Sequence, residues 1–144
     1  MMDEVTIDDF LSGAIKVVQP KSGYRAGIDP ILLAASIPAK SGQTVLELGC
    51  GVGTASLALA HRVAGLNITA VEVQPPYAEL ALRNTNRNNL QLSVVCADLA
   101  ALPSEILDQQ FDHVFANPPF FDRGSSTRSG DSGRDRAKGE NDEL

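Results

Sequence analysis

Four short apolar runs mark the middle of the chain, and longer stretches with helix signals separate them. The runs read TVLELG, ITAVEV, LSVVCAD and FDHVFAN, at residues 44–49, 68–73, 92–98 and 111–117. Their lengths and their branched aliphatic residues predict strands buried in a sheet.

Helices are predicted between these strands. TASLALAHRVAG at residues 54–65 ends at a glycine, and PPYAELALRNTNRNNL at residues 75–90 opens with two prolines and closes near two asparagines. Proline in the first turn and glycine or asparagine at the end are typical helix boundaries. A shorter helix is expected within residues 99–107.

Two further elements are expected before the first apolar run. GAIKVVQP at residues 13–20 predicts an edge strand, because Pro20 would end it. Asp29 is predicted to cap a helix that has Pro30 at its first position.

The alternation of strands and helices predicts an α/β fold with a doubly wound parallel sheet and helices on both faces. We divide the chain into an N-terminal segment with a lid and a helix (1–40), the core (41–121) and a polar tail (122–144). The tail is rich in glycine, serine and charge. Such a composition cannot bury a core, so the tail is expected to be disordered.

Composition narrows the classes of function. The 144 residues suit one domain, and no apolar run approaches the roughly 20 residues of a membrane helix. A net charge of −6 makes it less expected that this chain grips RNA alone. Cys50 and Cys96 show no metal-ligand spacing, so no metal site is predicted. Two unpaired thiols suit the reducing cytoplasm.

The strand ends carry the candidate chemistry, because ligands of parallel sheets bind at the carboxyl ends of strands. ELGCGVGT, from Glu47 to Thr54, places three glycines between a strand and a helix. A nicotinamide fingerprint would need G-x-G-x-x-G, and its third glycine is replaced by Thr54. Glu72 ends the second strand, where an acid can bind ribose hydroxyls. Asp98 ends the third strand.

Two motifs resemble one enzyme superfamily. ELGCGVGT resembles motif I of class I S-adenosylmethionine-dependent methyltransferases, and NPPF at residues 117–120 resembles motif IV of the branch that methylates amines. KSGYRAGIDPILLAA at residues 21–35 and the tail resemble the bacterial methyltransferases that modify adenine N6 in a valine tRNA. The resemblance implies a Rossmann-like fold, S-adenosylmethionine as cofactor and an exocyclic amine as acceptor, most simply adenine N6 in tRNA.

The resemblance also implies roles for individual residues. Glu47 would face the cationic cofactor, and Asp98 the adenine amine. Asn117 and the carbonyl of Pro118 would hold the acceptor nitrogen, Pro119 would stiffen the loop, and Phe120 would stack on a flipped base. The implied cofactor site comprises Tyr24, Arg25, Asp29, Glu47, Gly49, Cys50, Gly51, Gly53, Thr54, Glu72, Val73, Gln74, Ala97, Asp98, Leu99 and Asn117.

Members of that family extend beyond the point where this chain ends. We therefore expect a sheet that is incomplete on its C-terminal side, with an uncovered edge through which the chain could form a homo-oligomer. Alternative functions are methylation of guanine N2 in rRNA, methylation of a protein glutamine amide, and cofactor binding without catalysis. A nicotinamide-dependent oxidoreductase is a further alternative, which the missing glycine disfavours.

Overall fold

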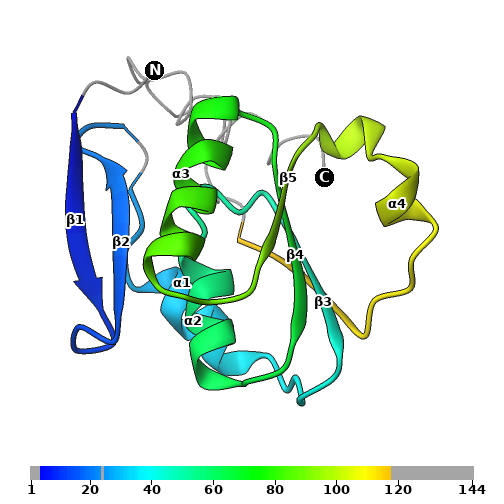
Figure 1. Cartoon of the computed structure of the whole chain (residues 1–144). Coiled ribbons are helices and arrows are strands. Elements are labelled where there is room, and N and C mark those ends of the chain that lie inside the picture. Colours follow the sequence, from blue (N-terminus) through cyan, green and yellow to red (C-terminus); the bar gives the residue numbers. More distant parts are fainter. Residues whose placement is uncertain (1–3, 24, 118–144) are drawn as a thin grey trace, which may run out of the picture.

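The computed structural model of the chain describes residues 4–23 and 25–117. Its centre is a parallel sheet of β3 (Thr44–Leu48), β4 (Asn67–Glu72), β5 (Ser93–Cys96) and β6 (His113–Ala116), in the order β5-β4-β3-β6 (Figure 1). All three pairings are parallel, so the carboxyl ends of the four strands meet at one edge of the sheet. The predicted strands are confirmed. β3, β5 and β6 are one to three residues shorter than their apolar runs, and β4 has the length of its run but begins and ends one residue earlier.

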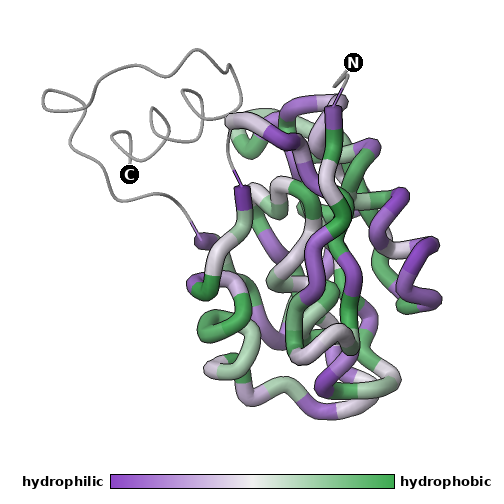
Figure 2. Tube along the Cα trace, turned by 90° about the vertical axis from the view of Figure 1, so that its left-hand side faces the viewer, coloured by the Kyte–Doolittle hydropathy of each residue, from purple (hydrophilic) through white to green (hydrophobic). Residues whose placement is uncertain are grey.

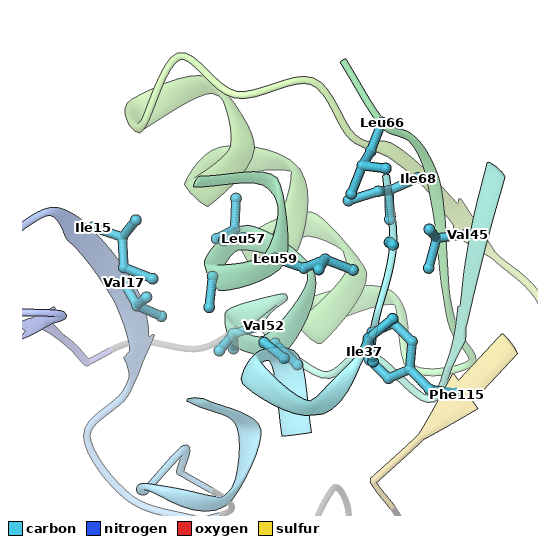
Figure 3. Close-up of a cluster of buried hydrophobic side chains, with 14 of the residues drawn as sticks. Ile15, Val17, Ile37, Val45, Val52, Leu57, Leu59, Leu66, Ile68 and Phe115 are labelled. Atoms are coloured by element: carbon cyan, nitrogen blue, oxygen red, sulfur yellow. The ribbon is translucent and has the colours of Figure 1, made fainter. Parts of the chain in front are cut away.

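Helices cover both faces of the sheet, as predicted. α1 (Asp29–Ser36), α2 (Thr54–Arg62) and α3 (Pro75–Arg87) lie on one face, and η1 (Leu99–Ala101) with α4 (Ser104–Leu107) lies on the other (Figure 1). Val45, Ile68 and Phe115 point from the sheet into the core beneath the first three helices (Figure 3).

Two predictions about helices were wrong in detail. The short helix expected within residues 99–107 is split, because Pro103 forces Leu102 before it into an extended conformation. Asp29 is not a cap: the N-cap is Ile28, without a side-chain hydrogen bond, and Asp29 is the first residue of α1. A carboxylate there still faces the positive end of the helix dipole.

An antiparallel hairpin of β1 (Val5–Phe10) and β2 (Ile15–Pro20) forms a separate layer. β2 packs on α2 and α3, so the helices lie between the hairpin and the sheet (Figure 1). The strand predicted at residues 13–20 therefore exists, but it does not belong to the main sheet. β1 was not predicted, because the two adjacent aspartates of VTIDDF have low strand propensity.

Hydrophobic and hydrophilic residues are distributed along every part of the fold. Figure 2 shows hydrophobic and hydrophilic residues interspersed along the elements, as expected where each element buries one side. Ile15 and Val17 of the hairpin and Leu57 and Leu59 of α2 are fully buried and belong to the same cluster (Figure 3). The hairpin is thus part of the main core.

Asn84 in α3 and Asn88 at its C-cap form hydrogen bonds with the backbone of β2, as a neighbouring strand would. The Asn84 side chain accepts from the backbone N–H of Val18 (2.7 Å) and donates to its carbonyl (2.9 Å). Asn88, one turn later, makes the same pair of bonds with Lys16, both at 2.8 Å. Residues i and i+4 share a helix face, and alternate strand residues turn their backbone groups the same way. Asn84 also donates to the carbonyl of Val52, at 2.9 Å.

Replacing Asn84 by alanine is expected to lower the free energy of unfolding by about 3 kcal/mol, since the buried backbone groups of Val18 and Val52 lose their partners. Urea unfolding would measure the change. Asn86→Ala, at an exposed position of the same helix, is the control and should change stability by less than about 0.5 kcal/mol. Equal effects of the two substitutions would show that the hydrogen bonds of Asn84 contribute nothing specific.

Candidate functional site

The glycine loop joins β3 to α2 at the carboxyl edge of the sheet. Gly49, Gly51 and Gly53 all have positive φ, and Gly53 is the left-handed N-cap of α2 at φ 93°. A side chain on Gly53 would be strained and would also meet Ala81 of α3. The loop is fastened to β4, because the N–H groups of Gly49 and Cys50 both donate to the carbonyl of Val71 at 2.8 and 2.9 Å.

Glu72 fixes the loop from the neighbouring strand. One carboxylate oxygen accepts from the N–H of Gly51 (3.0 Å), and the other accepts from the N–H of Gln74 (2.8 Å). The side chain is buried at the end of β4. The structure therefore brings together the glycine loop, Glu72 and the adjoining Val73 and Gln74.

Glu47 is buried below the loop rather than at its open mouth. Only 2% of the residue is exposed, and its carboxyl accepts a 2.6 Å hydrogen bond from the hydroxyl of Ser56 in α2. Burial raises the pKa of Glu47 to about 8; the hydrogen bonds from Ser56 oppose that rise, and the charge of Glu72 adds to it. Glu47 is therefore mostly protonated at neutral pH, which corrects the expectation of an accessible anion.

A pocket opens between this loop, the start of α1 and the end of β6. Its lining residues are Ala26, Pro30, Glu47, Gly49, Cys50, Gly51, Val52, Thr54, Ala55 and Asn117. Asn117 follows β6 directly and reaches the pocket because β6 pairs with β3. The predicted meeting of the first and fourth strand ends is thus present.

Thr54 is the unusual polar group of this pocket. Its residue is only 3% exposed, and its hydroxyl oxygen has no hydrogen-bond partner within the described part of the chain. Thr54 is also the first residue of α2, where backbone N–H groups and the helix dipole favour negative charge. A buried polar atom without a partner is costly, so this hydroxyl suits a polar ligand group.

Asp98 lies outside the pocket lining. It is exposed, two residues beyond the end of β5, and its carboxylate caps η1 by accepting from the N–H of Ala100 at 3.0 Å. The N–H of Ala97 donates to the carbonyl of Glu72, which holds this segment beside β4. Contact of Asp98 and the next residue, Leu99, with an adenine stays a prediction.

The N-terminal segment contains two predicted cofactor residues, Arg25 and Asp29. The Arg25 guanidinium is turned to the hairpin and donates to the carboxylate of Asp8 (2.9 Å), the hydroxyl of Thr6 (3.0 Å) and the carbonyl of Pro20. Asp29 is exposed. Neither lines the pocket, whereas Ala26 and Pro30 do.

Sequence reasoning missed four pocket residues, because small apolar side chains carry no chemical signal: Ala26, Pro30, Val52 and Ala55. Four predicted site residues lie outside the described residues, namely Tyr24, Pro118, Pro119 and Phe120.

No group of three or more His, Cys, Asp or Glu side chains is arranged to hold a metal ion within residues 4–23 and 25–117. Over the same residues, no helix has the length and apolar character needed to cross a membrane.

Comparison with known proteins points to one family. The family model described as the methyltransferase small domain matches residues 26–130. A tRNA1(Val) (adenine(37)-N6)-methyltransferase of Flavobacteriaceae bacterium (strain 3519-10) is 32% identical over 114 residues, which are 78% of this chain and 48% of that protein. The protein of the same name from Haemophilus influenzae is 34% identical over 116 residues, 77% of this chain and 49% of its own length.

The fold comparison agrees with this family. The crystal structure of Pyrococcus abyssi tRNA (uracil-54, C5)-methyltransferase with S-adenosyl-L-homocysteine superposes with a TM-score of 0.62 at 22% identity, over 81% of this chain and 29% of that one. This likeness shows a shared Rossmann-like fold. The chain spans about half the length of the curated relatives it matches. Since the family model covers most of its residues, the chain belongs to the methyltransferase small domain family.

Proposed function

We propose that this chain binds S-adenosylmethionine at the carboxyl edge of its sheet and is part of a methyltransferase that modifies adenine N6 in tRNA. The observation that carries the proposal is the pocket itself, where Asn117 at the start of the NPPF motif meets the glycine loop and Glu47. The names of the relatives from Flavobacteriaceae and Haemophilus influenzae support the reaction and the substrate. A cytoplasmic location belongs to the same proposal.

The residues present fit the amino-acid end of this cofactor. Its ammonium would pair with Glu47, whose carboxyl gives up its proton to make the charge pair. Its carboxylate would accept from the Thr54 hydroxyl and from N–H groups at the start of α2. The unpartnered Thr54 oxygen gains a hydrogen bond in this arrangement.

Glu72 fits the ribose, although both of its carboxylate oxygens already accept hydrogen bonds from backbone N–H groups. Carboxylate oxygens accept hydroxyl donors, and Glu72 ends β4 beside the glycine loop, where an acid can bind ribose hydroxyls. The two N–H groups fix the direction of the carboxylate, which prepares it for a polar ligand.

Transfer is proposed to depend on positioning. When bound, the cofactor supplies an electrophilic methyl group on a sulfonium. The Asn117 side-chain oxygen would accept one N–H of the substrate amine, and the Pro118 carbonyl would accept the other. These bonds would turn the nitrogen lone pair toward the methyl group and favour positive charge on nitrogen. No general base is needed before transfer, because the methylated ammonium loses its proton readily.

The proposed function is tested by incubating the chain with labelled S-adenosylmethionine and unmodified tRNA, followed by mass spectrometry of the nucleosides. We expect N6-methyladenosine. Label in N2-methylguanosine with rRNA, or in a glutamine amide with protein substrates, would favour the alternative acceptors. Cofactor binding without transfer to any of them would favour the non-catalytic alternative. Binding of NADH in place of the cofactor would favour the oxidoreductase.

Self-association stays a prediction. β6 lies at one end of the strand order, and Val114 is 57% exposed there. Both features support pairing between two copies of the chain along this edge.

Replacing Glu72 by alanine is expected to weaken binding of S-adenosylhomocysteine by ~10- to 100-fold, since the carboxylate would lose its bonds to the ribose and Gly51 would lose its anchor. Isothermal titration calorimetry measures the change. Glu79→Ala removes an exposed acid from α3 and should leave the affinity unchanged. Unchanged affinity in the Glu72 variant would remove this residue from the ribose site.

A further inference from the structure

One wall of the pocket comes from the segment between β2 and α1, and a single side chain of the hairpin holds that segment. Ala26 lines the pocket, and its N–H donates to the side-chain oxygen of Gln19 at 2.9 Å. Gln19 lies in β2 and is 2% exposed. A partly buried hydrogen bond therefore joins the hairpin to the pocket wall.

The orientation of the Gln19 amide is fixed from its other end. Its NH₂ group donates to one carboxylate oxygen of Asp8 at 2.7 Å. The same oxygen accepts from the hydroxyl of Thr6 (2.7 Å) and from the guanidinium of Arg25 (2.9 Å). The hydrogen bond from Gln19 is the main reason that the pKa of Asp8 is lowered, so this carboxylate stays an acceptor. Because Asp8 takes the NH₂ group, the amide oxygen must face Ala26.

The residue before Gln19, Val18, is connected to the part of the pocket lining that the glycine loop provides. Val18 exchanges two backbone hydrogen bonds with the side chain of Asn84, which also donates to the carbonyl of Val52 in the glycine loop. Val52 lines the pocket, as Ala26 does. Two adjacent residues of β2 therefore hold two parts of the pocket lining. Gln19 binds Ala26 directly, and Val18 is connected to Val52 through the fully buried side chain of Asn84.

We propose that Gln19, oriented by Asp8 and Arg25, is a positioning residue that sets the spacing between the Ala26 wall and the glycine loop, and so selects ligands that carry the amino-acid chain. This inference rests on the proposed function. Glu47 and Thr54 line the same pocket, so the spacing of its walls governs the amino-acid end of the ligand. Arg25 thereby acts through Asp8 and Gln19 and does not contact the cofactor.

Two ligands that share the same adenosine should respond differently to a change at Gln19. S-adenosylhomocysteine carries the amino-acid chain, and 5′-methylthioadenosine lacks it. Gln19→Met keeps the length of the side chain but removes both hydrogen bonds. We expect this variant to bind S-adenosylhomocysteine about tenfold more weakly and methylthioadenosine within about twofold of the unchanged chain. Arg25→Ala should act in the same direction, and Arg25→Lys, which retains the charge beside Asp8, should restore part of the affinity.

Calorimetry with both ligands tests the inference. Lys21→Ala is the control, because it removes an exposed ion pair with Glu4 from the same hairpin without touching the network. An equal loss for both ligands, or no loss for either, would overturn the inference and assign Gln19 a role in stability alone. Failure of the unchanged chain to bind either ligand would overturn the proposed function, and the inference with it.

Hydrogen exchange of the Ala26 amide supplies a test without ligand. We expect protection in the unchanged chain and at least tenfold faster exchange in Gln19→Met, with the Val18 amide still protected. Loss of protection at both amides would mean that the variant unfolds the hairpin. In that case Asp8→Asn supplies the test, because it retains the size of the Asp8 side chain and weakens the orientation of the Gln19 amide. This variant must bind S-adenosylhomocysteine more weakly than the unchanged chain does, while its affinity for methylthioadenosine stays nearly unchanged. If it does not, the inference is overturned.

Discussion

Replacing Asn117 by alanine is expected to lower the rate of methyl transfer by ~10²–10³-fold, the usual effect of losing one preorganised polar contact to a transition state. Asn117 reaches the pocket from the end of β6, opposite Glu47 and the glycine loop. Its amide would hold the acceptor nitrogen and only border the cofactor. The affinity for S-adenosylhomocysteine should therefore stay within about twofold of the unchanged value.

Single-turnover transfer to tRNA measures the rate, and calorimetry measures the affinity. Asn67→Ala is a suitable control, because Asn67 is exposed at the opposite end of β4. A large loss of cofactor affinity in Asn117→Ala would place the amide in the cofactor site. An unchanged rate with unchanged affinity would separate NPPF from the chemistry altogether.

The second large effect concerns pH. The pKa of Glu47 is about 8 in the folded chain and near its ordinary value of 4.5 in the unfolded chain, so between these values the folded state keeps a proton that the unfolded state releases. The contribution of Glu47 to stability is complete below pH 4.5. It falls as pH rises, by at most about 1.4 kcal/mol per pH unit, and levels off above pH 8.

Urea unfolding of the unchanged chain and of Glu47→Gln, at several values between pH 5 and pH 8.5, measures this difference. The glutamine variant retains an acceptor for Ser56 and cannot ionise. Its free energy of unfolding should fall less steeply with pH than that of the unchanged chain. If the free energy of unfolding changed equally with pH in both chains, Glu47 would be ionised in the folded state. That result would contradict the burial of its carboxyl.

The parts of the fold that local signals specify were predictable from the sequence. The four parallel strands follow from short apolar runs, and the glycine loop follows from three glycines between a strand and a helix. The carboxyl ends of parallel strands must share an edge, so the meeting of Glu47, Glu72 and Asn117 near one loop also followed from topology.

The N-terminal layer was not predictable in the same way. β1 contains two adjacent aspartates, and only the pairing with β2 and the network around Asp8 make its strand favourable. Arg25 was assigned to the cofactor because its segment resembles a family motif, but its donors are engaged by the hairpin. Hydrogen bonds between residues distant in sequence leave no periodic pattern.

Burial also changed the expected chemistry of the site. Glu47 is one residue before the end of β3, and a sequence shows its charge but not the Ser56 hydroxyl or the apolar core around it. Thr54 was assigned to the cofactor site from the resemblance, and only the structure shows that its hydroxyl is buried without a partner in the described part of the chain. The sequence thus located the site, while packing determined the protonation and the accessibility of its groups.

We propose that the glycine loop, Glu47, Thr54 and Asn117 form one cofactor pocket, and a crystal structure of the chain with S-adenosylhomocysteine would show whether they do. We expect the amino-acid end between Glu47 and Thr54, the ribose on Glu72, and the sulfur facing the side-chain oxygen of Asn117. Ligand bound at another edge of the sheet, or an Asn117 oxygen turned away from the sulfur, would contradict it.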